Sequence, residues 1–358
     1  MLRKLAHRPM MQLLAVGLAL AAPASINAQT IFERLRPSWI FERHAYYDPL
    51  SAEPRAAAMK ILFPARSSSV PFAQHPGQST VWDISVGDEI PLVGWTAGDK
   101  PEGEPTAQKK FGIGIWFPLS FHMIEDMSKD DSKPILDTDY RFGVMIKAQW
   151  GLPSEWHHTH QSHIGLRYVP IAHESTHLGD EFTLNARIYG NAFERVNVSY
   201  QYWELGGSFE PNFLQDGRLE TKFRGGMIHE AFHSGIGWYD AELLQPAGGT
   251  VTLSNRNTEP YAGAELFYSP DPDRGGLGPF LSFDYRDRTV YGYHRPSRAT
   301  PERVEGSINV LLGVRHIRVG ARIRPSYYLR YYHGVNPAGQ FRSQENYQLY
   351  GFGALFQF

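Results

Sequence analysis

The chain ends with Leu349-Tyr350-Gly351-Phe352-Gly353-Ala354-Leu355-Phe356-Gln357-Phe358, a stretch that alternates strictly with period two. Its aromatic face consists of Tyr350, Phe352, Ala354, Phe356 and Phe358. Successive side chains of a β-strand point to opposite faces of the sheet, so this stretch predicts a strand with one lipid-compatible face. Such a strand, closing on a terminal Phe, is typical of membrane β-barrels, and we expect the barrel-assembly machinery to recognise it through Phe358. The alternative is an edge strand of a soluble sandwich.

The same alternation recurs upstream, for example over residues 139–150, 195–202 and 322–331. Strands are predicted near residues 55–64, 79–90, 110–122, 138–150, 160–174, 193–209, 217–230, 255–268, 278–288, 305–315, 320–332 and 346–358. Their number is even, as in single-chain bacterial barrels. The predicted fold is therefore all-β, an antiparallel transmembrane β-barrel of about 12 strands, with roughly 10 or 14 as alternatives.

The N-terminus has the layout of a secretory signal peptide. Arg3, Lys4 and Arg8 precede an apolar stretch at residues 13–22, and small residues lead to a cleavage point after Ala28. We expect residues 1–28 to be cleaved and residues 55–358 to form the barrel. Residues 29–54 do not alternate, and they are predicted to form either a periplasmic lead-in or a lumenal plug.

The composition agrees with a wall that faces lipid. The chain contains 21 Phe and 19 Tyr, as lipid-facing bands and interfacial girdles require. The formal net charge of -2 provides no basic field, so nucleic acid is not an expected partner. The absence of cysteine excludes disulfides and thiolate metal sites. The expected location is the outer membrane of a Gram-negative cell, with outer-membrane lipid as the surrounding partner.

The stretch most suggestive of chemistry is His173-Glu174-Ser175-Thr176-His177-Leu178-Gly179-Asp180-Glu181, which the strand count places at the outward rim of the barrel. It contains the H-E-x-x-H pattern of zinc proteases, but that pattern brings two imidazoles to one metal only on a helix. The alternating residues before it, which include Pro170, favour a strand. We therefore predict no metal and no cofactor at this stretch.

On a strand, residues two apart share a face, so His173, Ser175 and His177 are predicted to point together into the lumen. Ser175 is then a candidate nucleophile, with His173 or His177 as its base. Asp180 or Glu181 is the candidate group that orients the imidazole ring. The alternative is a hydrogen-bonded polar network without catalysis, of the kind that lines barrel lumens in general.

Candidate substrate-binding residues lie on two further segments. Arg195, Asn197 and Ser199 are predicted on the neighbouring strand, as donors for a phosphate or an oxyanion. His333 and Gln340 belong to the last outward loop, and closure of the barrel is expected to bring them towards the same rim. The alternative for that loop is a tight turn built on its Asn-Pro and Gly residues.

Four stretches of the chain carry a resemblance to a known family: residues 138–143, 173–181, 195–200 and 332–341. They resemble the bacterial outer-membrane family catalogued as domain of unknown function 1207, over about residues 48–358. The most specific part is the string His-x-Ser-Ser/Thr-His-Leu-Gly-Asp-Glu, which is matched by His173, Ser175, His177, Gly179, Asp180 and Glu181. The resemblance implies export and a barrel. It implies no activity, because the family is uncharacterised.

Two functions follow as hypotheses. The first is an acyl hydrolase that acts on lipopolysaccharide or phospholipid of the outer leaflet, because a site at the rim has lipid beside it. The architecture is similar to that of outer-membrane lipid hydrolases, which supports this hypothesis only by analogy. The second is a passive narrow channel, or a structural barrel whose lumenal charges pair with one another.

Overall fold

The computed structural model describes residues 36–39, 49–54, 56–68, 78–97, 111–128, 133–152, 162–179, 194–196, 199–211, 218–233, 237–240, 245–250, 258–270, 275–290, 293–295, 298–300, 303–317, 324–342 and 344–357. The predicted signal peptide and Phe358 lie outside these ranges. Within them, no helix is long and apolar enough to cross a membrane.

The described residues are organised almost entirely as β-strands. The strands are β1 (Arg36–Trp39), β2 (Met59–Ser68), β3 (Gln78–Ala97), β4 (Phe111–Asp126), β5 (Ile135–Gly151), β6 (His163–Leu178), β7 (Glu194–Val196), β8 (Ser199–Glu210), β9 (Leu219–His233), β10 (Gly237–Asp240), β11 (Gln245–Thr250), β12 (Thr258–Tyr268), β13 (Gly276–Val290), β14 (Tyr293–Arg295), β15 (Arg298–Thr300), β16 (Arg303–Ile317), β17 (Arg324–Gly334) and β18 (Tyr347–Gln357). A short 3-10 helix, η2 (Gly339–Phe341), lies between β17 and β18.

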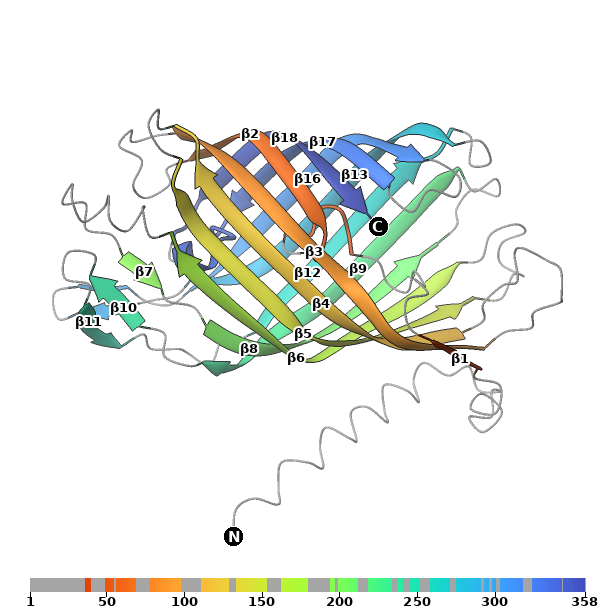
Figure 1. Cartoon of the computed structure of the whole chain (residues 1–358), viewed down its shortest axis with the longest axis horizontal. Coiled ribbons are helices and arrows are strands. Elements are labelled where there is room, and N and C mark those ends of the chain that lie inside the picture. The colour runs from red at the N-terminus through yellow and green to blue at the C-terminus, as the bar shows by residue number, and fades with distance from the viewer. Residues whose placement is uncertain are drawn as a thin grey trace, which may run out of the picture.

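Twelve of these strands close into one antiparallel barrel, in which each barrel strand pairs with the next one along the chain (Figure 1). The barrel strands are β2, β3, β4, β5, β6, β8, β9, β12, β13, β16, β17 and β18. Closure comes from β18, which pairs with β2 from Leu349↔Ser67 to Phe356↔Met59. Because a closed barrel has no open edge, the backbone of every strand is hydrogen-bonded to neighbouring strands, as a membrane requires.

The predicted number of strands is confirmed, and the predicted segments overlap the observed strands throughout. The largest difference is at the link expected over residues 91–109. There β3 continues to Ala97 and β4 begins at Phe111, so the two strands extend as a hairpin beyond the neighbouring β2. Strand β1 pairs with this extension at residues 93–96 of β3. Outside the barrel, β7, β10 and β11 form a small sheet, visible at the left of Figure 1, and β14 pairs with β15.

The outside of the wall is apolar, as lipid contact requires. Leu277, Leu312 and Leu329 expose 58%, 56% and 59% of their surface. A soluble monomer does not carry an apolar surface that extends around its whole sheet, whereas a membrane barrel does. The terminal strand follows the predicted alternation, because Tyr350 and Phe352 face outward while the alternate residues face inward.

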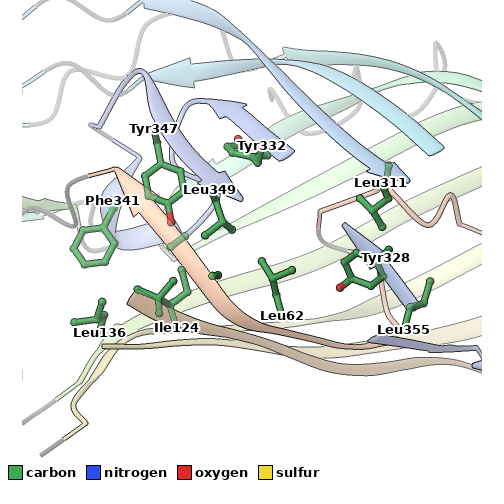
Figure 2. Packing of buried hydrophobic residues seen from close by; sticks show 14 of the residues in the cluster. Leu62, Ile124, Leu136, Leu311, Tyr328, Tyr332, Phe341, Tyr347, Leu349 and Leu355 are labelled. Atoms are coloured by element: carbon green, nitrogen blue, oxygen red, sulfur yellow. The ribbon is translucent and has the colours of Figure 1, made fainter. Parts of the chain in front are cut away.

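The inside of the barrel is a packed core. Leu62 of β2 and Leu349 of β18 belong to one buried apolar cluster with Tyr332 and Tyr347, and Figure 2 shows Leu349 beside the ring of Tyr347. Leu62, Leu349 and Tyr347 are at most 1% exposed. The seam where the first and last barrel strands meet is therefore sealed by side chains on its inner face.

Residues 49–54, called the lumenal segment below, lie inside the barrel. Ser51 N donates a hydrogen bond of 2.7 Å to the carboxylate of Glu265, and Ala52 N donates one of 2.9 Å to Ser282 Oγ. Ala52 is fully buried. Within residues 29–54, residues 49–54 thus lie in the lumen, whereas residues 36–39 pair with the extension of β3.

Glu53 holds the lumenal segment electrostatically. Its carboxylate lies 2.6 Å from Arg224 Nη1 and 4.0 Å from both Arg167 Nη1 and Arg286 Nη2. Burial alone would raise the pKa of the Glu53 carboxyl. The guanidinium groups of Arg224, Arg167 and Arg286 outweigh this effect and hold the pKa well below its ordinary value. Glu53 therefore remains ionised and binds the segment to three barrel strands.

Residues 335–342, called the inward-folded loop below, enter the lumen from the other direction. Gly339 N donates hydrogen bonds of 3.2 Å to both carboxylate oxygens of Asp139 on β5. Arg342 is completely buried and contacts Glu230 at 2.8 Å and also Glu259. The last outward loop is therefore a lumenal element and more than a tight turn between two strands.

Candidate active site on the membrane-facing wall

Strand β6 contains a bulge that reverses which of its residues face lipid. Strand β6 uses three residue steps from Tyr168 to Ile171 where the paired strand β5 uses two. The pairing of β6 with β8 contains the same shift of one residue. Pro170 lies in this bulge, a place where the missing N–H of proline is tolerated. Before the bulge the even-numbered residues face outward, such as Leu166 at 38% exposure, and after it the odd-numbered ones do, such as Ile171 at 50%.

The bulge overturns the predicted direction of the candidate site. Glu174 and Thr176 are 3% and 0% exposed and point into the lumen. His173, Ser175 and His177 therefore face the membrane, and the prediction that they point into the lumen is wrong. It is wrong because a shift of one residue moves every following side chain of a strand to the other face.

Ser175 and His177 lie together on this outer surface. The distance between Ser175 Oγ and His177 Nε2 is 3.3 Å, and the pair is exposed. The His177 ring also meets the ring of Tyr140 edge-on, with 5.7 Å between centroids. Because β6 ends at Leu178, the pair lies close to the outward end of its strand. A hydroxyl within hydrogen-bond reach of an imidazole is the arrangement that activates a serine nucleophile.

Strand β8 places two further polar residues beside this pair. Ser199 is opposite Ser175 in the register, and Gln201 is opposite His173. Tyr200 and Tyr202 are buried, at 4% and 2% exposure, and point into the lumen. The alternate residues Ser199 and Gln201 therefore face outward. Sequence analysis predicted Ser199 but missed Gln201, although Gln201 shares the outer face of the same strand with Ser199.

His173 lies on the same outer face, where its ring is 5.3 Å from the ring of Phe142. The two histidines and Glu174 of the H-E-x-x-H pattern are on a strand and on opposite sides of the barrel wall. They cannot converge on one metal ion, so the geometry excludes the zinc-protease interpretation.

Several predicted residues do not join the site or fall outside the described chain. The backbone of Arg195 belongs to β7, which pairs with β10 in the small sheet, at Arg195↔Tyr239, and is no part of the barrel wall. The side chain of Arg195 and the whole of Asn197, Asp180 and Glu181 lie outside the described residues. Their predicted roles stay predictions.

The two candidates from the last loop are separated from Ser175. His333 faces outward on β17, because Tyr332 beside it points into the lumen, and β17 is the sixth barrel strand from β6 in the ring. Gln340 belongs to η2, and its side chain lies outside the described residues. Its neighbour Gly339 lies on the lumenal side of Thr176, so the wall stands between this loop and Ser175. The predicted convergence of His333 with the first group is wrong.

The lumenal charges form a paired network. Glu204 lies 3.4 Å from Arg141 and 3.3 Å from Arg167, and it accepts a 2.9 Å hydrogen bond from Tyr261. A second group joins Asp83 to His122 at 2.8 Å and to Arg330 at 2.7 Å. These contacts hold the wall and its lumenal elements together and need no catalytic explanation.

Comparison with known proteins finds only distant similarity to solved structures. No protein-family model and no curated protein matches the chain. Among solved structures it is similar to outer membrane phospholipase A from Escherichia coli, at 9% identity over 84% of this chain and 92% of that chain, with a TM-score of 0.38. It is also similar to the translocator domain of the autotransporter NalP from Neisseria meningitidis, at 10% identity over 84% of this chain and 87% of that chain, with a TM-score of 0.36. At such values the similarity carries no information on the activity of this chain.

Proposed function

We propose that this protein is an acyl hydrolase of the outer membrane that acts on a lipid of the outer leaflet, with its site on the outside of the barrel wall. The observation that carries the proposal is the distance of 3.3 Å between Ser175 Oγ and His177 Nε2 on the membrane-facing surface. A lipid ester at the level of the headgroups reaches this surface directly, without entering the barrel.

In the proposed reaction Ser175 Oγ attacks the carbonyl carbon of a lipid acyl ester. His177 Nε2 accepts the hydroxyl proton and then donates it to the departing alcohol, which leaves an acyl group on Ser175. Water hydrolyses this intermediate with His177 again as the base. His177 is preferred over His173 as the base because its contact with Ser175 is observed. Asp180 or Glu181 remains the proposed group that orients the ring.

The place of the pair supports a functional role. Lipid-facing positions of a barrel are normally apolar, because polar groups that lose water without a partner cost free energy. On β6 the outward residues before and just after the bulge follow this rule, as Ile164, Leu166 and Ile171 show. Ser175 and His177 break it at the outward end, where a lipid substrate would meet them.

The alternative of a passive channel has less support. The lumenal segment and the inward-folded loop both occupy the lumen and are tied to the wall by buried hydrogen bonds and ion pairs. A cavity beside Pro54, Arg286 and Arg288 has a volume of about 10 Å³, near the lower limit for one water molecule. A structural barrel without catalysis stays the second hypothesis.

The lipid profile of the outer membrane tests the proposal. Membranes from cells that overexpress wild type are compared with membranes that carry the Ser175→Ala variant, which should fold equally because its side chain is on the outer surface. The proposal expects lysophospholipid or deacylated lipopolysaccharide with wild type only. Identical lipid profiles at equal amounts of folded protein would remove the hydrolase and leave the structural barrel.

A further inference from the structure

A second polar cluster lies on the outer wall, two strands away from Ser175. His229 of β9 and Thr258 of β12 are opposite each other in the register, and His229 Nδ1 lies 2.8 Å from Thr258 Oγ1. The ring of Trp203 on β8 packs 5.2 Å from the His229 ring. This cluster of Trp203, His229 and Thr258 is called the rim cluster below.

The rim cluster faces the membrane. Glu204, Glu230 and Glu259 are each at most 3% exposed and point into the lumen, so the residues next to them on their strands point outward. Thr258 is the first residue of β12 and is exposed, which places the cluster towards the outward end of the wall. Further along the same strands the outer face becomes apolar, with Leu205 on β8 and Met227 on β9.

The rim cluster is continuous with the candidate active site. Gln201 lies between them on the outer face of β8, two residues from Trp203 and opposite His173 of β6 in the register. Polar side chains thus run along the outer face from Ser175 across β8 to Thr258, towards the outward end of the wall. On the outer face of β17, Tyr331 is 46% exposed, and His333 follows it towards the end of the strand.

We propose that the rim cluster binds the phosphate group of an outer-leaflet lipid and so holds the substrate beside Ser175. In the proposed site the Thr258 hydroxyl donates to Nδ1 of His229, and Nε2–H of His229 is the donor to the phosphate. Trp203 lies on β8 between the polar Gln201 and the exposed, apolar Leu205, and tryptophan is favoured where the apolar face of a membrane protein ends. The statement that the bound lipid is a substrate rests on the proposed function. The binding of phosphate by the rim cluster does not.

Phosphate is the chemistry that fits these residues best among the groups of an outer-leaflet lipid. An imidazole N–H binds anionic oxygens through a charge-assisted hydrogen bond, which is stronger than a bond to a neutral ester. The phosphate of a glycerophospholipid and that of lipid A share this chemistry, and the experiment distinguishes them.

Native mass spectrometry of the full chain in detergent micelles tests the proposal through bound lipid. The probes are dimyristoylphosphatidylglycerol, diphosphorylated lipid A and dimyristoylglycerol, which has the same tails without phosphate. All measurements use the Ser175→Ala background, so that bound lipid is not consumed. His229→Phe should weaken binding of a phosphorylated lipid by about tenfold, as loss of one hydrogen bond to a charged group implies. Thr258→Val should also weaken it, because it removes the hydroxyl that bonds to Nδ1 of His229. Tyr331→Phe, on the outer face of β17 three strands away from Thr258, is the matched control and should bind as the parent does.

Two results would overturn the proposal. One is equal binding of dimyristoylglycerol and the phosphorylated lipids, and the other is unchanged phosphorylated-lipid binding in both rim-cluster variants. Thr258→Val keeps the shape of an exposed strand residue, so loss of the fold does not confuse the comparison. Failure of the proposed function shows separately, as absence of lipid hydrolysis by wild type, and leaves the binding result intact.

Discussion

Replacing Glu53 by Gln removes the charge that ties the lumenal segment to the barrel while keeping the size of the side chain. Glu53 is 3% exposed, and its carboxylate is 2.6 Å from Arg224 with Arg167 and Arg286 at 4.0 Å. Arg167 keeps Glu204 at 3.3 Å after the change. Arg224 and Arg286 lose the carboxylate that lies between them.

The expected loss of stability follows from this geometry. Removal of one partner of a buried ion pair costs about 3–5 kcal/mol. The folded-to-unfolded ratio should therefore fall by at least about two orders of magnitude. The same substitution at Glu210 is a matched control, because Glu210 meets Lys222 at 3.5 Å with side-chain exposures of 28% and 20%. A pair as exposed as this one contributes about 0–1 kcal/mol.

Equilibrium unfolding in guanidinium chloride measures both variants in lipid vesicles, with tryptophan fluorescence as the signal. Glu53→Gln should lower the midpoint clearly, and Glu210→Gln should leave it near that of wild type. Equal midpoints for Glu53→Gln and wild type would refute the reasoning. They would mean that the lumenal segment is not held by the Glu53 carboxylate.

Three further predictions concern the lumen. Because the pKa of Glu53 in the folded barrel is below its ordinary value of 4.5, its stabilising effect is complete above about pH 5 and declines below it; the difference in unfolding midpoint between wild type and Glu53→Gln should accordingly shrink from about pH 5 to about pH 3. Gly339→Ala would place a Cβ 2.0 Å from Thr176 Cγ2 and should cost about 1–3 kcal/mol in the same unfolding assay, whereas an added Cβ at Gly207 meets nothing closer than 3.8 Å and Gly207→Ala should be nearly neutral. Wild type in planar bilayers should give no conductance steps, because the lumenal segment and the inward-folded loop fill the lumen; regular open-channel steps would contradict this.

Most of the barrel could be predicted from sequence because its strands obey one local rule. Alternation of apolar and polar side chains marks each strand wherever one face meets lipid and the other meets the lumen. The terminal strand is the clearest case, and Tyr350 and Phe352 face outward as predicted. Strand ends were less well predicted, as at β3, because alternation does not reveal how far a hairpin extends beyond its neighbours.

The direction of the candidate site could not be predicted by the same rule. Counting by two fails across a bulge, and Pro170 alone does not reveal whether the strand contains an extra residue. The contacts of the lumenal elements could not be predicted for a different reason, because they join residues far apart in the chain. Glu53 and Arg224 are an example, because only the closed barrel brings them within 2.6 Å of each other.

Covalent labelling of Ser175 tests the account most directly. The purified full chain in mixed micelles of detergent and phospholipid is treated with a fluorophosphonate probe, and the modified peptide is identified by mass spectrometry. The account predicts a single adduct on Ser175 and labelling slower by about 100-fold or more in His177→Asn, since an activating base contributes that much. An unmodified Ser175 in folded wild type, or equal labelling rates with and without His177, would contradict it.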